Sequence, residues 1–212
     1  MPPRRSYDQY CSAARALDSV GDRWTLLIVR ELLAGPRRYT DLHADLPGVS
    51  TDVLASRLKD MEAGDLVTRR RLPPPVPAYV YELTDRGRAL TPVLEALAHW
   101  GAPALGAPRP TDAVRAHWFA VPLLGVLREL GEGTVQVHLD EGEFHVRTAE
   151  GASGYGEGPA PEIPDLVLVL DAATCRALAC GELGLADGVR EGRIEAAGQG
   201  RLAAALREAA TV

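Results

Sequence analysis

Several residue types and patterns are scarce or absent in the sequence, and each absence excludes a class of protein. Only three cysteines occur in 212 residues, an odd number that does not make a disulfide framework, so a reducing compartment is expected. No apolar run reaches the length of a membrane-spanning helix, and the basic start lacks the apolar segment of a signal peptide. We therefore expect a cytoplasmic protein without a membrane partner.

Motifs of the common enzyme classes are also absent. The chain contains no Walker phosphate-binding loop, no Gly-x-Gly-x-x-Gly, no Gly-x-Ser-x-Gly and no His-Glu-x-x-His. The five histidines show no metal-ligand spacing, and Cys175 and Cys180 point to different faces of one expected helix. We expect neither an enzyme nor a bound metal or other cofactor.

The distribution of charge divides the chain into two halves. Residues 1–110 hold 15 basic and 13 acidic residues, whereas residues 111–212 hold 8 and 16. A near-neutral half with local arginine clusters can bind phosphates, but the acidic half would be repelled from DNA. We expect two domains, at 1–102 and 111–212, joined by a Gly/Ala/Pro-rich linker at 103–110.

The stretch STDVLASRLKDMEAGDLV has the clearest helical pattern of the first half. Leu54, Leu58 and Met61 recur at the spacing of one buried helical face, with Ser50 as the N-cap and Gly64 as the first residue beyond the helix. The other face is polar and rich in hydrogen-bonding groups. The candidate contacts with a partner molecule on this face are Thr51, Asp52, Ser56, Arg57 and Lys59, together with Ser50.

A shorter helix at 41–46, capped by Thr40, precedes this segment, and Pro47-Gly48 forces a tight break between the two helices. Two helices joined in this way form a helix-turn-helix, whose second helix can enter the major groove of duplex DNA. Arg37 and Arg38 lie at the entrance of the shorter helix, and with Thr40 they are candidate DNA contacts. The two arginines either hold a DNA phosphate or form an ordinary solvated charge pair.

Two expected strands, at 66–72 and 79–83, follow the second helix and surround the proline-rich stretch 73–77. A hairpin in this position is a wing, and it carries Arg69, Arg70 and Arg71 in succession. Because neighbouring residues of a strand point to opposite faces, not all three arginines can point at DNA. The sequence therefore predicts a winged helix whose partner is double-stranded DNA.

Three stretches resemble the HxlR-type branch of bacterial winged-helix repressors, within the MarR/ArsR-like superfamily. They are CSAARALDSVGDRWTLLIVRELLAGPRRYTDL, GVSTDVLASRLKDMEAGDLV and YELTDRGRALTPVLEALAHWG, and they cover about residues 7–102. The resemblance implies a homodimer built by helices outside the winged helix, including one expected from the Thr84 cap to Trp100. It also implies a sensing role for the Cys11 thiol, for which an inert small apolar residue is the alternative.

Alternating and helical patterns also fill the second half. We expect a helix from Thr111 or Asp112, interrupted at Pro122, and then a hairpin of strands at 134–140 and 143–148. The apolar run DLVLVL predicts a strand covered on both faces. Beyond it the pattern predicts helices at 172–180, with Asp171 as cap, and at 183–191, a strand at 193–196 and a helix at 199–210.

The motifs DAATCRALACGEL and RIEAAG, with the elements around them, resemble the sterol-carrier-protein-2-like fold over about residues 112–210. This resemblance implies a pocket for an apolar effector between sheet and helices. The residues expected to line it are Trp118, Phe119, Leu123, Leu127, Val167 and Val169.

The expected fold class is α+β, with an N-terminal winged helix-turn-helix domain followed by a C-terminal α/β domain. The expected function is that of a homodimeric transcriptional regulator, most simply a repressor, that recognises a pseudo-palindromic operator and senses an apolar effector. Two alternatives remain open. The second half is either a carrier or enzyme-like domain to which DNA binding is secondary, or a purely structural module for dimerisation and stability.

Overall fold

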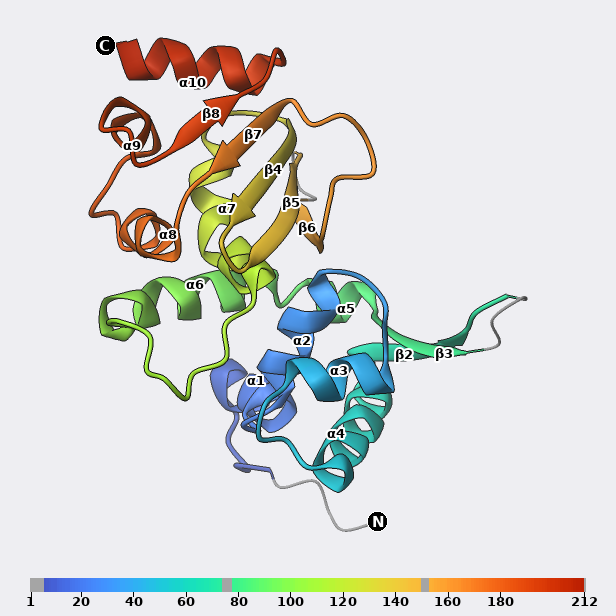
Figure 1. Ribbon diagram of the computed structural model, residues 1–212. Helices are drawn as coiled ribbons and strands as arrows, with labels where there is room; N and C mark the ends of the chain where they lie inside the picture. The colour runs from blue at the N-terminus through green and yellow to red at the C-terminus, as the bar shows by residue number, and fades with distance from the viewer. Residues whose placement is uncertain (1–5, 74–77, 150–152, 212) are drawn as a thin grey trace. The chain divides into compact units, whose positions relative to one another are not determined.

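A computed structural model describes residues 6–73, 78–149 and 153–211 of the chain (Figure 1). It consists of two compact units, Met1–Leu90 and Thr91–Val212, and both mix helices with a sheet. The predicted α+β class is therefore confirmed at this level. The units divide before the position expected for the linker, because the helix that starts at Thr91 packs on a helix of the second unit.

The first unit contains five helices and three strands in its described residues. In chain order these are α1 (Ser12–Val20), α2 (Thr25–Leu33), β1 (Arg37–Arg38), α3 (Tyr39–Asp45), α4 (Thr51–Ala63), β2 (Val67–Arg71), β3 (Tyr79–Leu83) and α5 (Asp85–Arg88). The strands form an antiparallel sheet in the order β1-β3-β2, and Ile28, Leu42, Leu54 and Leu58 lie in the core with at most 1% exposure. The predicted helix-turn-helix and wing are thus present, although residues 74–77 of the wing's proline-rich stretch lie outside the described residues.

Capping explains where α4 begins and ends. The Ser50 hydroxyl accepts a hydrogen bond from the Val53 amide at 3.4 Å, as predicted for an N-cap. At the other end, the left-handed residue is Asp65 (φ 57°) rather than Gly64 (φ −90°), so the prediction for the C-terminus was one residue too early. The Leu66 amide reaches back to the Met61 carbonyl, which closes the turn and satisfies a helix-end carbonyl.

Two other helix boundaries differ from the prediction. α3 starts at Tyr39, so Thr40 lies inside the helix instead of capping it. The single helix expected from Thr84 to Trp100 is two helices. Thr84 does cap α5, by accepting from the Gly87 amide at 3.1 Å, but the chain breaks at Ala89-Leu90 and α6 starts at Thr91. Pro92 lacks an amide donor and its ring would clash with the preceding turn, which accounts for the break.

The described part of the second unit contains α6 (Thr91–Gly101), two short 3₁₀ helices and a five-stranded sheet with four further helices. These elements are η1 (Ala102–Ala104), η2 (Ala116–Phe119), α7 (Ala120–Arg128), β4 (Gly133–Leu139), β5 (Gly142–Thr148), β6 (Gly154–Glu157), β7 (Leu166–Val169), α8 (Ala172–Ala179), α9 (Leu185–Arg190), β8 (Glu195–Ala197) and α10 (Arg201–Thr211). The predicted hairpin is β4–β5, and Asp171 caps α8 by accepting from the Thr174 amide at 2.7 Å. The helix expected from Thr111 or Asp112 begins only at Ala116; before it, the Asp112 carboxylate accepts from the Arg109 amide and guanidinium.

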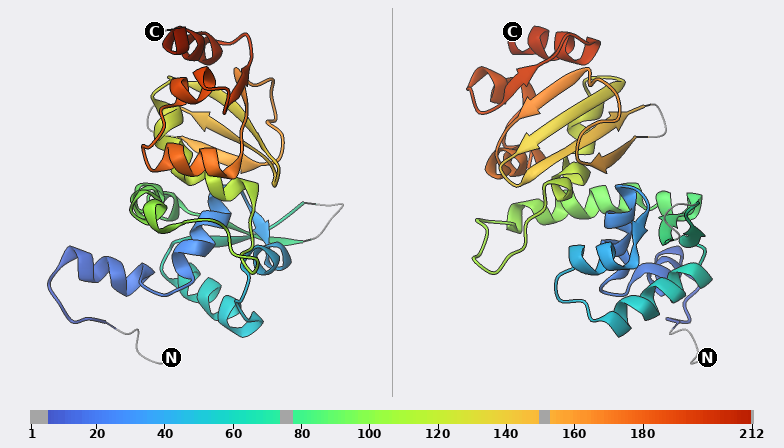
Figure 2. Two further views of the ribbon diagram at one scale, coloured as in Figure 1. Left: turned by 60° about the vertical axis from the view of Figure 1, so that its left-hand side comes forward. Right: turned by 45° about the vertical axis from the view of Figure 1, so that its right-hand side comes forward.

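The strand order in the second sheet is β6-β5-β4-β7-β8, with β4 and β7 parallel and the other pairs antiparallel. Helix α7 lies against one face of this sheet (Figure 2). On that face Leu166 and Leu168 of β7 are buried, whereas Val169, on the other face, is 44% exposed. The prediction that the DLVLVL strand is covered on both faces was therefore wrong: the run is uniformly apolar, but the strand still has one inner and one outer face.

Candidate nucleic-acid interface

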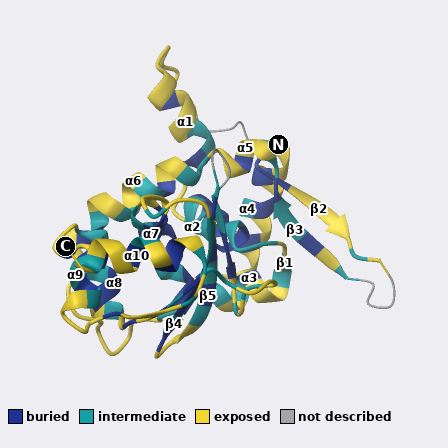
Figure 3. Cartoon of the chain, turned by 90° about the horizontal axis from the view of Figure 1, so that it is seen from above, coloured by how far each residue is buried: buried dark blue, intermediate teal, exposed yellow. Residues whose placement is uncertain are grey.

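The exposed face of α4 carries the polar residues that the sequence pattern predicts there. Thr51, Asp52, Ser56 and Lys59 are all exposed, whereas Leu54, Leu58 and Met61 are at most 2% exposed on the opposite side. The helix also exposes Val53 (41%), Asp60 and Glu62. Helix α4 therefore presents hydrogen-bonding groups outward over its whole length. This is the arrangement that a helix needs if its side chains are to reach base edges in a major groove. The outer residues of the wing strand β2, which follows α4, are exposed as well (Figure 3).

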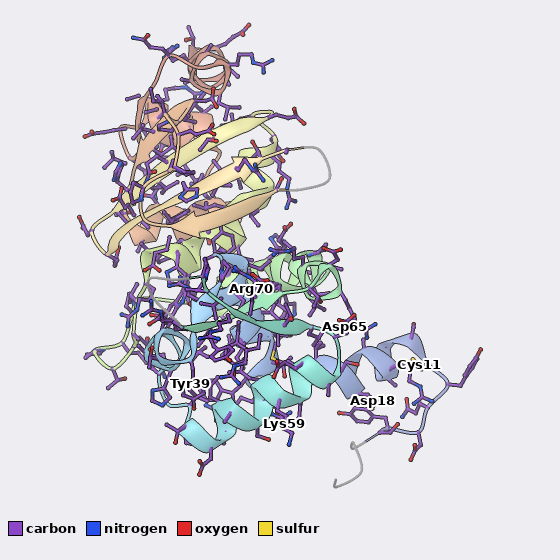
Figure 4. All side chains as sticks on the ribbon, turned by 90° about the vertical axis from the view of Figure 1, so that its right-hand side faces the viewer. Cys11, Asp18, Tyr39, Lys59, Asp65 and Arg70 are labelled. Carbon is purple, nitrogen blue, oxygen red and sulfur yellow. The ribbon has the colours of Figure 1, made fainter. Side chains whose placement is uncertain are left out.

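Tyr39 fixes how the two helices of the helix-turn-helix meet. It is the first residue of α3, and its hydroxyl donates a hydrogen bond to the Thr51 carbonyl at 2.7 Å. Figure 4 shows Tyr39 beside one end of α4 and Asp65 at the other end, with Lys59 between them on the exposed side. Tyr39 was not among the predicted site residues; its place at the start of α3 becomes apparent only once the α3 boundary is known.

Arg57 does not lie with the exposed residues of α4. Its guanidinium contacts Asp60 at 2.8 Å on the same helix and Asp22 at 3.5 Å in the connection between α1 and α2. Its side chain is 26% exposed. The two carboxylates hold the Arg57 guanidinium against the connection between α1 and α2. Arg57 therefore links α4 to the rest of the first unit and does not face outward with Ser56 and Lys59.

The adjacent arginines Arg37 and Arg38 have different environments. The Arg37 guanidinium lies 3.6 Å from the Asp45 carboxylate, and both side chains are 15% exposed, so this pair links β1 to α3. Arg38 is exposed, and its backbone amide donates to the Asp41 carboxylate at 3.3 Å. The structure therefore leaves the charge of Arg38 available at the start of α3 while it uses the charge of Arg37 internally.

On the wing, the three arginines are divided between the two faces of β2. Arg70 donates from Nε to both oxygens of Glu82 at 3.1 Å, and these hydrogen bonds and the nearby negative charge raise the pKa of the Arg70 guanidinium above its usual value. The Arg69 guanidinium instead lies over the ring of Tyr79 at 4.1 Å. Among the described residues, no carboxylate pairs with Arg38, Lys59, Arg69 or Arg71.

Cys11 and Cys175 differ in exposure, and this difference decides which thiol could react. Cys11 is exposed and precedes α1, and Arg15 of that helix pairs with Asp18 at 3.5 Å. Figure 4 shows Cys11 and Asp18 at this end of the first unit. Cys175 is buried, and the loss of solvation raises the pKa of its thiol to about 12. Core packing is therefore the role of Cys175, while sensing by Cys11 stays a prediction.

The residues predicted to line an effector pocket do not share one face of the sheet. Leu123 and Leu127 of α7 are at most 2% exposed, and Trp118 and Phe119 of η2 are partly exposed. Val167 and Val169 alternate with the buried leucines of β7 and therefore lie on the opposite side of the sheet from α7. The structure brings together the four residues of η2 and α7 but not the two valines.

No helix in the described part of the chain is long and apolar enough to span a membrane. The described residues also contain no cluster of three histidine, cysteine, aspartate or glutamate side chains suited to a metal ion.

Comparisons with known proteins match the first half of the chain. Residues 19–107 match the family model of the HxlR-like helix-turn-helix. The uncharacterized HTH-type transcriptional regulator YvaP of Bacillus subtilis (strain 168) is 40% identical over 86 residues, which cover 41% of this chain and 80% of YvaP. The HTH-type transcriptional regulator YodB of the same organism is 35% identical over 85 residues, which cover 40% of this chain and 76% of YodB. A solved structure of reduced YodB, at 30% identity, covers 48% of this chain and 100% of that chain with a TM-score of 0.41.

Proposed function

The chain belongs to the HxlR-like helix-turn-helix family of DNA-binding transcriptional regulators, and from this premise we propose that it recognises a pseudo-palindromic operator as a homodimeric repressor. The observation that supports this most directly is the face of α4: Thr51, Asp52, Ser56 and Lys59 are exposed opposite a buried leucine and methionine stripe. Side chains on such a face can read base edges, while Arg38, Arg69 and Arg71 contact phosphates.

A stripe of exposed apolar residues on α6 supports the homodimer. Val93, Leu97 and Trp100 recur at the spacing of one helical face and are 42%, 44% and 82% exposed. Exposed large apolar side chains in one stripe are a costly surface for a monomer, and a second copy of the same stripe would cover them. Two-fold symmetry of the protein then requires two-fold symmetry of the operator, with half-sites about 34–36 Å apart.

For the second unit, we propose regulation of DNA binding by a small apolar molecule held near η2 and α7. The partly exposed Trp118 and Phe119 support a site there, whereas the full burial of Leu123 and Leu127 favours the alternative of a structural module filled by its own side chains. An effector of this kind would typically couple to DNA binding by about 1–3 kcal/mol. The acidic balance of this half keeps it from competing for DNA itself.

The test of the proposed function is selection of bound duplexes from a random DNA pool, performed with the full chain and repeated with a small-molecule extract. We expect the selection to enrich a DNA site with two related halves. If the second unit is a sensor, adding the extract should change the amount of bound DNA that is recovered. A good side-chain-to-base contact is worth about 1–3 kcal/mol of discrimination, so Thr51→Ala or Ser56→Ala should relax the selected sequence.

Arg38→Ala is the matched control, because a phosphate contact carries no direct sequence information. It should weaken binding to all duplexes and leave the selected sequence intact. Recovery of unenriched DNA would contradict sequence-specific recognition, and equal losses on specific and random DNA for both α4 variants would contradict the assignment of its exposed face.

A further inference from the structure

We propose that Tyr79 is a positioning residue that presents the Arg69 guanidinium to a DNA phosphate, and that Glu82 holds Arg70 on the opposite face of the wing, away from DNA. This inference rests on the proposed function, since it specifies which wing residues contact the DNA backbone and what orients them. The partner of the Arg69 guanidinium is the phosphate backbone of duplex DNA.

Strand register separates the two faces of the wing. Arg69 pairs with Tyr81 and Arg71 pairs with Tyr79 across the β2–β3 ladder, and paired residues lie on the same face. These four residues therefore form one face, and Arg70 lies on the other. We call the outer part of the first side the Arg69 face; besides Arg69 it comprises Arg71, Tyr79 and Tyr81, while Val67 and Leu83 at the base of the hairpin follow on the same side and are buried.

The opposite face has its positive charge neutralised within the free protein. Arg70 donates two hydrogen bonds from Nε and one from Nη2 to the Glu82 carboxylate, each at 3.1 Å. Using Arg70 against a phosphate would require this bidentate pair to break and would leave the Glu82 carboxylate close to the negatively charged backbone. Electrostatics therefore favours the Arg69 face for contact with DNA.

The stacking of Arg69 on Tyr79 restricts Arg69 without neutralising it. The Cζ atom of Arg69 lies 4.1 Å from the ring centroid, and the Tyr79 side chain is 50% exposed, so this contact is at the surface. A guanidinium that lies over a ring keeps its positive charge and has N–H donors that can still meet phosphate oxygens. Because the ring already limits the rotamers of Arg69, less conformational entropy is lost when the phosphate binds.

This arrangement predicts different roles for Arg69 and Tyr79. Arg69 would contribute charge, so its removal changes the salt dependence of binding. Tyr79 would contribute orientation through its ring, so its removal weakens binding only while Arg69 is present. The hydroxyl of Tyr79 has no part in the stacking, and a phenylalanine should therefore replace it.

The experiment measures binding of the full chain to a fluorescent duplex, over salt concentrations of about 50–200 mM, for wild type and for Arg69→Ala, Arg70→Ala, Tyr79→Phe, Tyr79→Leu and the Arg69→Ala/Tyr79→Leu double variant. Arg69→Ala should flatten the log–log salt slope by about 0.9 for each phosphate that the wing no longer binds. Tyr79→Leu should weaken binding about two- to fivefold per wing, and Tyr79→Phe should bind like wild type. Arg70→Ala should keep the wild-type slope.

The double variant separates positioning from a structural role. If Tyr79 acts through Arg69, Tyr79→Leu has no further effect on affinity in the Arg69→Ala background, and the thermal midpoints of all variants stay close to wild type. Equal losses with and without Arg69, or a loss in Tyr79→Phe as large as in Tyr79→Leu, would overturn the positioning role. A flatter slope in Arg70→Ala than in Arg69→Ala would overturn the choice of face. Failure of the wild-type chain to bind any duplex would instead overturn the proposed function, and the inference with it.

Discussion

The two compact units use arginine in different ways. In the second unit, where 17 acidic residues accompany 9 arginines, ion pairs hold Arg109, Arg128, Arg176, Arg190 and Arg193. In the first unit, with 14 basic and 12 acidic residues, ion pairs also hold five arginines, namely Arg15, Arg30, Arg37, Arg57 and Arg70. Arg38, Lys59, Arg69 and Arg71 of this unit pair with no described carboxylate. These ion pairs therefore hold a smaller share of the basic residues in the first unit, and the four residues without such a pair can act on a phosphate.

The largest expected change in stability comes from removing a core side chain, and it tests whether the two units unfold separately. Phe144 in β5 is fully buried, and Phe144→Ala should destabilise the second unit by about 3–5 kcal/mol through reduced burial and the cavity left behind. Leu58→Ala, at a residue 1% exposed in α4, is the matched change in the first unit. Differential scanning calorimetry should show each substitution lowering a different transition, and a common shift of the whole profile would contradict the division.

A smaller effect distinguishes paired from unpaired arginines within the first unit. Arg37→Ala leaves the largely buried Asp45 carboxylate without this partner and should cost about 1–3 kcal/mol of stability. Arg38→Ala, at the next residue, should change stability by less than about 0.5 kcal/mol. Urea unfolding measures both. The opposite ranking, or equal losses, would show that the burial of the Arg37–Asp45 pair does not determine its role.

In the second unit, the Asp171 cap links stability to pH. Its hydrogen bond from Thr174 lowers the pKa of the Asp171 carboxyl below its ordinary value of 3.8. The stabilisation is therefore complete above that ordinary value and is lost as pH falls through the lowered folded-state pKa. Asp171→Ala should cost about 1 kcal/mol at neutral pH, and the difference from wild type should shrink in acid. Asp171→Asn, which keeps an acceptor, should retain most of the stability at both pH values; an Ala penalty independent of pH would contradict the linkage.

The smallest expected effect is a gain at the end of α4. Asp65 has a positive φ of 57°, which an L side chain adopts at some cost, whereas glycine adopts it freely. Asp65→Gly should therefore stabilise the first unit by about 0.5 kcal/mol, after allowance for the greater freedom of glycine in the unfolded chain. Gly64→Ala, at a negative φ that alanine also adopts, provides the contrast, because it should stabilise the unit by about 0.4–1 kcal/mol through the lower entropy of the unfolded chain alone. A destabilised Asp65→Gly variant would show that the carboxylate makes a contribution larger than the strain.

Sequence periodicity predicted α4 and the β4–β5 hairpin because each has one apolar face along its whole length, and local capping gave Ser50 and Asp171 correctly. It failed where distant residues decide the outcome. The partners of Arg37, Arg57 and Arg70 are carboxylates brought close by tertiary structure, so their spacing in sequence gave no sign that they are engaged. Similarly, the uniform apolar composition around β7 concealed which of its residues point away from α7, and only the register with β4 separates Val167 and Val169 from the leucines.

Helix α6 belongs to the DNA-binding half by its family match, but it packs within the second unit. The family match extends to residue 107, so this helix is inherited with the DNA-binding half, yet in the folded chain it belongs to the second unit. Glu95 of α6 accepts from Arg128 of α7 at 2.9 Å, which fixes the inherited helix to a partner outside the matched region. A gene rearrangement that exchanged everything beyond residue 107 would remove α7 and leave Glu95 and its helix face uncovered. Evolutionary change in α6 and α7 is therefore expected to be correlated, even though the two helices lie on opposite sides of the family boundary.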